Sequence, residues 1–397
     1  MLTAFDFAAS PHIHFGSGKR DTLKDLASSF SHEDGGRILL VTGGDSFDAS
    51  PLCRKLETEL AAEFQLRRLR VEEEPSPSLI DAAVAEHRHF DPACVIAIGG
   101  GSAVDAGKAI AGLLLLGHSV MEYLEGVGKG LAYRGPSAPF IAVPTTAGTG
   151  GETSKNAVLS VIGEGGFKKS FRHEMLVARH IILDPELTLT CPAELTAACG
   201  MDAFTQLLES YVSSQANAMT DALALSAMRI VRDCLPRVVA DADDLTARSG
   251  MLYASSMSGL TLANAGLGSV HGLASPLGAF FPIPHGVVCG TLLHVATDVN
   301  IRAMQDREPE NPSLARYAQA GRLLSKDDGL SQSAALDALL ALLEEWTTLF
   351  RMPLLGVYGV GHEDVPRIVA SSRGNSMQTN PIVLSDEEIA GLISHRL

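Results

Sequence analysis

The sequence has 397 residues and a formal net charge of −15, and hydrophobic residues make up 46% of it. A chain of this length typically forms two domains and buries a large core without cross-links. The negative charge argues against nucleic acids and anionic membranes as partners, because both attract a basic surface.

The cysteines and the N-terminal segment predict the compartment. The six cysteines form no CxxC pair, a pattern typical of a reducing environment. The N-terminal segment lacks the basic start of a signal peptide, and the longest apolar runs are too short to span a bilayer. These features predict a cytoplasmic protein with no membrane segment.

The first half of the sequence alternates short apolar runs with helical patterns. Strands are expected at 37–42, 65–71, 93–98, 139–143 and 181–183, with 65–71 as an outer strand, and helices at 51–64, 77–89 and 102–115. Such alternation predicts a parallel sheet with helices on both faces. From about Pro192 helical patterns dominate, at 192–214, 218–239, 243–265, 313–325, 330–350 and 385–396. The fold class predicted is an α/β domain over 1–188 followed by an all-helical domain over 189–397.

A glycine-rich segment at 99–108, GGGSAVDAGK, follows an apolar strand and opens a helix. Glycines let backbone N–H groups approach a pyrophosphate, and a helix N-terminus adds free donors. A tight strand-to-helix turn without a ligand is the alternative interpretation. A second turn at 144–151, PTTAGTGG, also follows a strand and combines hydroxyls with glycines. Because ligands of open α/β sheets bind at the carboxyl ends of the strands, the two turns together favour a nucleotide site.

Polar residues in the helical half suggest a metal site. Asp202, Gln206 and Glu209 are spaced i, i+4 and i+7, so they share one helix face among apolar residues. His271 and His285 each lie beside glycine and proline in apolar surroundings. Two imidazoles and a carboxylate suit a divalent metal. The alternatives are buried core histidines and a polar stripe lining a crevice.

The sequence resembles the iron-containing (group III) alcohol dehydrogenases, of the dehydroquinate-synthase-like superfamily. The motifs that carry the resemblance occur in order along nearly the whole chain, at 13–18, 99–108, 144–158, 182–188, 200–211 and 271–287. The resemblance implies a nucleotide domain and a helical domain with the cofactor between them. It also implies a pyrophosphate site lined by Gly99, Gly100, Gly101, Ser102 and Asp105, a ribose and nicotinamide site bordered by Thr145, Thr146 and Thr149, and metal ligands at Asp202, His271 and His285.

Three positions depart from the family's pattern. Gln206 stands where the family has a fourth ligand, a histidine. Its amide oxygen would bind Fe²⁺ or Zn²⁺ more weakly than an imidazole would. Ser275 replaces another histidine and removes a proton relay. Gly43 stands where NAD-preferring members carry an aspartate. With Gly44 and Ser46 beside it, this turn favours NADP over NAD, although Asp45 follows closely.

The function predicted is hydride transfer between NAD(P)(H) and a primary alcohol or aldehyde. Asp202, His271 and His285 are the expected catalytic residues, with Gln206 assisting them in holding a divalent metal. A metal-independent reductase of an oxo-acid such as maleylacetate is the nearest alternative, ahead of a polyol dehydrogenase. A non-catalytic nucleotide-binding protein is the alternative from another class. The resemblance also implies that the chain forms a homo-oligomer, expected to be a dimer.

Overall fold

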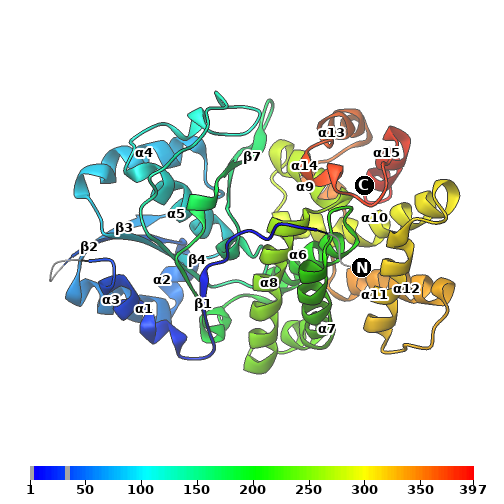
Figure 1. The fold of residues 1–397 in the computed structure, drawn as a ribbon, viewed down its shortest axis with the longest axis horizontal. Coiled ribbons are helices and arrows are strands. Elements are labelled where there is room, and N and C mark those ends of the chain that lie inside the picture. Colours follow the sequence, from blue (N-terminus) through cyan, green and yellow to red (C-terminus); the bar gives the residue numbers. More distant parts are fainter. Residues whose placement is uncertain (1–3, 32–35) are drawn as a thin grey trace.

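The computed structural model describes residues 4–31 and 36–397, so the first three residues of the N-terminal segment lie outside the described part. Figure 1 shows an α/β half, coloured blue to teal, beside a helical half, coloured green to red. The N-terminal segment crosses to the helical half, where the backbone N–H of Ala8 donates to Asn264 Oδ1 at 2.6 Å. No helix in the described ranges combines the length and apolar character needed to cross a bilayer.

A six-stranded parallel sheet forms the centre of the first half. Its strand order is β1-β8-β5-β4-β2-β3, which places β3 at an edge, as predicted. The strands are β1 (His12–Phe15), β2 (Arg37–Thr42), β3 (Gln65–Arg70), β4 (Cys94–Gly99), β5 (Phe140–Pro144) and β8 (His180–Leu183). The inner strands β2, β4 and β5 are almost wholly buried, since helices cover both faces of the sheet.

The two faces of the sheet have separate cores, and alternation along each strand divides the residues between them. Leu39 and Val41 of β2 pack towards α4 (Pro77–His87) and α5 (Gly101–Leu114). Ile38 and Leu40 pack towards α1 (Leu23–Ser28), α2 (Asp45–Ala49) and α3 (Pro51–Glu63). Figure 1 shows these two helical layers above and below the sheet. The predicted doubly covered parallel sheet is confirmed.

An antiparallel hairpin, β6 (Asn156–Val161) and β7 (Phe167–Arg172), was not predicted. It leaves the sheet after β5 and reaches the helical half, where β7 contacts α9. After β8 a short helical turn, η6 (Pro185–Thr188), precedes the first long helix, so the predicted division at 188/189 falls in a connection.

The second half contains helices and no strand among its residues 189–397, all of which are described. Its helices are α6 (Ala193–Val212), α7 (Ala218–Ala240), α8 (Leu245–Ala265), α9 (Ser269–Phe280), α10 (His285–Arg307), α11 (Pro312–Ser325), α12 (Gln332–Leu349), α13 (Val365–Ser371), α14 (Asn375–Gln378) and α15 (Asp386–Ser394). The predicted all-helical half is confirmed, with α9, α10, α13 and α14 added to the expected helices. Its core includes Trp346, whose ring meets Phe204 edge-on at 5.0 Å between centroids.

Candidate functional site

Three turns lie side by side at the carboxyl edge of the sheet, after the neighbouring strands β2, β4 and β5. The N–H of Gly43 donates to Ile98 O at 3.2 Å, and the N–H of Thr145 donates to Gly99 O at 2.9 Å, so adjacent turns are tied together. The predicted cofactor residues lie at or after the carboxyl ends of these strands, at Gly43, Gly44, Ser46, Gly99, Gly100, Gly101, Ser102, Asp105, Thr145, Thr146 and Thr149.

Close packing excludes a side chain at Gly99 of the middle turn and leaves little room for one at Gly101. A Cβ on Gly99 would lie 2.7 Å from the Cβ of Ala103 and 3.0 Å from the backbone nitrogen of Gly43. A Cβ on Gly101 would lie 3.2 Å from Thr149 Cγ2, in the turn that follows β5. No side chain caps the start of α5, so the N–H groups of its first turn stay available to an anion.

Lys108 holds the turn after β5 in place. It belongs to the glycine-rich segment, and no role was predicted for it. Its side chain is fully buried. The ammonium donates to three backbone carbonyls, Gly151 O at 2.5 Å, Asn156 O at 2.7 Å and Ser154 O at 2.9 Å. Burial lowers the pKa of Lys108 to about 8, against the attraction of nearby Asp105 and Glu152. The lysine therefore fastens the turn after β5 to helix α5.

Asp105 faces the same buried region. Burial raises the pKa of Asp105 to about 6, although Lys108 and a backbone hydrogen bond from Val158 oppose the shift. A Cβ on Gly151 would lie 3.7 Å from Asp105 Oδ1. These contacts place the carboxylate between α5, β6 and the turn after β5, so it supports the wall of the predicted pyrophosphate site.

The turn after β2 carries its own charged cluster. Arg70, at the end of β3, pairs with Asp45, with Asp48 at 2.6 Å and with Glu72 at 2.9 Å. Gly44 lies beside this guanidinium, since a Cβ there would be 3.8 Å from Arg70 Nε. The turn predicted to favour NADP therefore lies beside a cation that already pairs with three carboxylates.

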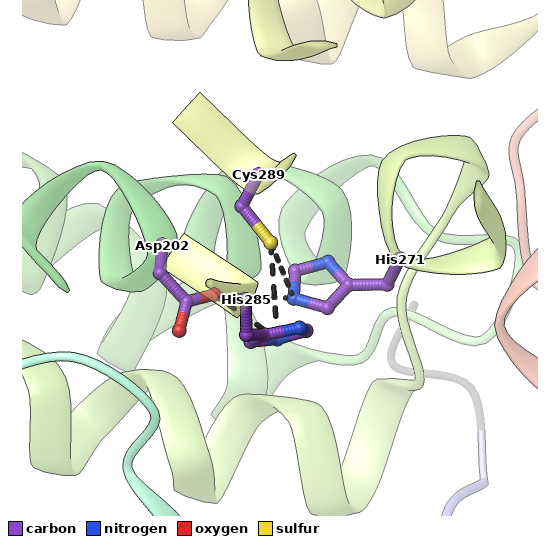
Figure 2. Close-up of side chains that lie close together, drawn as sticks. All are labelled: Asp202, His271, His285 and Cys289. Atoms are coloured by element: carbon purple, nitrogen blue, oxygen red, sulfur yellow. Dashed lines mark hydrogen bonds and ion pairs between the residues drawn. The ribbon is translucent and has the colours of Figure 1, made fainter. Parts of the chain in front are cut away.

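Asp202, His271, His285 and Cys289 gather in the helical half, with their donor atoms all within 4.8 Å of one another (Figure 2). Asp202 comes from α6, His271 from α9, and His285 and Cys289 from α10. Asp202 Oδ1 lies 3.3 Å from His271 Nε2 and 3.7 Å from His285 Nε2. Cys289 Sγ lies 3.6 Å from His271 Nε2 and 3.8 Å from His285 Nε2. The structure thus brings together the three residues predicted to be catalytic.

Glu209 fixes the orientation of His271. Its Oε2 lies 2.7 Å from His271 Nδ1, and its Oε1 accepts the backbone N–H of Val270 at 2.7 Å. A bond from Nδ1–H to this carboxylate leaves Nε2 as the ring atom that is directed at Asp202 and Cys289. This carboxylate–imidazole arrangement is the usual support of a metal-binding histidine.

Charges in the cluster depend strongly on burial. Burial would raise the pKa of Asp202, but the imidazoles of His285 and His271 hold it below its ordinary value. Burial would lower the pKa of His271, but Cys289, Asp202 and Glu209 hold it well above its ordinary value. Burial lowers the pKa of His285 to about 4 and raises that of the Cys289 thiol to about 12.

The nucleotide edge and the side-chain cluster face each other across close backbone contacts. A Cβ on Gly148, in the turn after β5, would lie 2.9 Å from the Cβ of Cys199. Cys199 precedes Asp202 by three residues on α6, and a Cβ on Gly286 would lie 2.6 Å from Ala198 O in the same turn of α6. These contacts set the turn after β5 and the start of α10 against the helical turn of α6 that precedes Asp202.

Comparison with known proteins agrees with this arrangement. Residues 10–185 match the family described as "Iron-containing alcohol dehydrogenase", and residues 196–397 match "Fe-containing alcohol dehydrogenase family, C-terminal". This chain belongs to the iron-containing alcohol dehydrogenase family. The predicted family is confirmed, and the reaction class expected from it, alcohol dehydrogenase or aldehyde reductase, is supported.

Several relatives of this iron-containing alcohol dehydrogenase family match most of the chain. The NAD-dependent methanol dehydrogenase of Bacillus methanolicus is 31% identical over 95% of this chain and 97% of its own. The 1-propanol dehydrogenase PduQ of Citrobacter freundii is 31% identical over 98% of this chain and 99% of its own. A solved 1,3-propanediol oxidoreductase aligns with a TM-score of 0.89 at 29% identity, over 100% of both chains.

Gln206, a predicted ligand, is oriented differently from the other three. Its Nε2 donates to Asp202 Oδ1 at 3.2 Å, and its Oε1 accepts from Ser258 Oγ at 2.7 Å. The amide oxygen predicted to bind a metal is therefore occupied by a hydroxyl, and the N–H side faces the cluster. Ser275, at the other altered position, donates to Lys168 O at 3.1 Å and joins α9 to β7.

Cys289 is the member of the cluster that sequence reasoning missed. It lies four residues after His285, a spacing that places both on one helix face. The signal was present, but the expected helices stopped at residue 265 and resumed at 313. Without a helix over 285–307, the i, i+4 relation of His285 and Cys289 had no structural meaning.

Proposed function

We propose that this chain transfers a hydride between a nicotinamide cofactor and a primary alcohol or aldehyde. The observation that carries the proposal is the contact of Gly148 with Cys199, which sets the turn after β5 beside the Asp202 cluster. A cofactor extended along the sheet edge would present its reactive ring at this junction. Positioning of the two reactants is then the main task of the protein.

The residues of the sheet edge suit a dinucleotide. The N–H groups at the start of α5, with Gly100, Gly101 and Ser102, face the expected place of the pyrophosphate. Thr145, Thr146 and Thr149 lie in the neighbouring turn, which Lys108 anchors through its carbonyl contacts. We assign the ribose and nicotinamide to that turn.

A divalent ion, Fe²⁺ or Zn²⁺, fits the donors of the helical half. Asp202, His271 and His285 point an oxygen and two nitrogens at one another, and such a set of electron-pair donors is stabilised by a cation. When bound, the ion supplies Lewis acidity that polarises a carbonyl oxygen. Glu209 keeps the Nδ1 proton of His271 in place, and Gln206 restrains Asp202.

The test is oxidation of NADH and NADPH against a panel of aldehydes, with metal analysis of the same preparation. We expect turnover with short primary aldehydes and loss of activity after chelation, restored by added Fe²⁺ or Zn²⁺. Cofactor binding without turnover on any aldehyde would refute the catalytic proposal. Full activity of metal-free protein would exclude a catalytic role for the metal and favour the oxo-acid reductase alternative.

For the cofactor we propose a modest preference for NADP(H). Gly43 and Gly44 bring no carboxylate to the end of β2, and Arg70 lies beside Gly44. A 2′-phosphate would compete with Asp45, Asp48 and Glu72 for this guanidinium, which limits the preference. A kcat/KM that is higher with NADH than with NADPH would overturn this part. The homodimer stays a prediction, measurable by light scattering.

A further inference from the structure

We propose that Cys289 is a ligand of the divalent ion, so that the metal site of this chain consists of Asp202, His271, His285 and Cys289. The inference rests on the proposed function, which places an ion among the first three residues. Under it, Gln206 is a hydrogen-bonding support of Asp202 and not a ligand.

Four of the six separations between donor atoms match those that a tetrahedral ion imposes, and all six are within 4.8 Å. With metal–nitrogen and metal–oxygen distances of about 2.0–2.1 Å and a zinc–sulfur distance of about 2.3 Å, tetrahedral donors lie about 3.4 Å apart for nitrogen and oxygen and about 3.6 Å apart for nitrogen and sulfur. The observed nitrogen–oxygen separations are 3.3 and 3.7 Å. The nitrogen–sulfur separations are 3.6 and 3.8 Å.

The sulfur is held in this position by the packing of α10 on α6. Gly286 and Gly290, on either side of Cys289 along α10, allow the close approach of the two helices. A Cβ on Gly286 would lie 2.6 Å from Ala198 O, and one on Gly290 would lie 3.1 Å from Met201 Cβ. Cys289 is fully buried between them, and its sulfur points at both imidazoles (Figure 2).

Gln206 is excluded from the ligand set by its own contacts. The Oε1 atom already accepts the hydroxyl of Ser258 at 2.7 Å, while Nε2, a donor that cannot bind a cation, faces Asp202. Turning the amide to offer its oxygen would replace the Nε2 donor to Asp202 with a carbonyl oxygen that faces the carboxylate. Cys289 therefore provides the fourth metal-binding atom in place of the Gln206 amide oxygen.

A thiolate among the ligands changes the expected metal. Sulfur donors select zinc and other soft ions, whereas carboxylate and amide oxygens suit harder ones. Two imidazoles, one carboxylate and one thiolate form a set that zinc accepts in tetrahedral geometry. We therefore expect purified protein to retain Zn²⁺ in preference to Fe²⁺ when both are supplied in equal amounts.

The decisive experiment is replacement of the native metal by Co²⁺ in the full-length protein, followed by absorption spectroscopy. We expect one tightly bound Co²⁺ with a near-ultraviolet thiolate-to-cobalt charge-transfer band. The band should disappear in Cys289→Ser, whose metal affinity should fall by at least ~10-fold in chelator competition. It should persist in Gln206→Ala and in the matched control Cys53→Ser, a buried thiol of helix α3.

A surface cluster of His12, His14 and His180 is a second place where added cobalt can bind, with His14 Nε2 3.2 Å from His180 Nδ1. Its donors are all imidazoles, so cobalt there adds no thiolate band, and His14→Gln removes it from the stoichiometry. Wild-type protein that binds cobalt in the helical half without the band would overturn the role of Cys289 while leaving the metal-assisted function intact. Wild-type protein that binds no cobalt in the helical half would overturn both the role of Cys289 and the metal-assisted function. The wild-type spectrum alone decides between these outcomes, so the test stands even if Cys289→Ser does not fold.

Discussion

Lys108→Met tests whether a buried ammonium fastens the nucleotide half. The methionine keeps the unbranched apolar stem, one atom shorter than lysine, but leaves the carbonyls of Gly151, Ser154 and Asn156 without their donor. Each unsatisfied buried carbonyl costs about 1–3 kcal/mol, while the burial penalty of the charge is recovered. Because these two effects oppose each other, we take the lower end of the summed cost of the three carbonyls. We expect a loss of about 3 kcal/mol in the free energy of unfolding.

The assay is urea unfolding followed by far-ultraviolet circular dichroism, together with the KM for the cofactor. The matched control is Lys155→Met, because Lys155 lies in the same region but is partly exposed and paired with Glu174 at 2.5 Å. A surface pair of this kind contributes about 0–1 kcal/mol. We expect Lys108→Met to raise the KM for cofactor and to leave the metal content unchanged. Equal destabilisation by the two variants would refute the anchoring role.

Three further outcomes are expected. Glu209→Gln should lower metal affinity about 10–100-fold in chelator competition, because the carboxylate orients His271, and unchanged affinity would contradict that role. Burial raises the pKa of Glu152 from 4.5 to about 7, so the folded state takes up a proton between these values and stability falls as pH rises through them. Glu152→Gln should thus stabilise the protein by roughly 1–3 kcal/mol near pH 8, a gain that shrinks towards pH 4.5, and a gain independent of pH would disprove the assignment. Arg70→Ala should reduce kcat/KM about tenfold with NADPH and much less with NADH, consistent with loss of one phosphate contact, whereas equal losses would rule out a 2′-phosphate site there.

The nucleotide half was predictable because its local signals agree with its environment. The strands near 37–42, 93–98 and 139–143 are continuously apolar, and helices bury both of their faces. Each ends at glycine or proline, where the chain turns into a loop. The positions of Asp202, His271 and His285 in one cluster were expected from the resemblance, since their separation along the chain gives no local indication of contact.

The helices around the cluster were missed because small and cyclic residues look like helix breakers in isolation. Gly272 lies within α9, where a Cβ would be 2.9 Å from Met377 Cε, and Pro276 lies inside the same helix. Gly286 and Gly290 serve the close contact of α10 with α6. In each case tertiary packing overrides the propensity of the residue. The hairpin β6–β7 was missed because β7 is half exposed and its turn is rich in glycine.

The single indole of the chain, Trp346, has a consequence for spectroscopy. It lies on α12 and packs against Phe204, two residues after Asp202 on α6. Its emission therefore reports on the helical half alone, while the circular dichroism signal covers both halves. Superimposing the two denaturation curves thus shows directly whether the halves melt as one cooperative unit or one after the other.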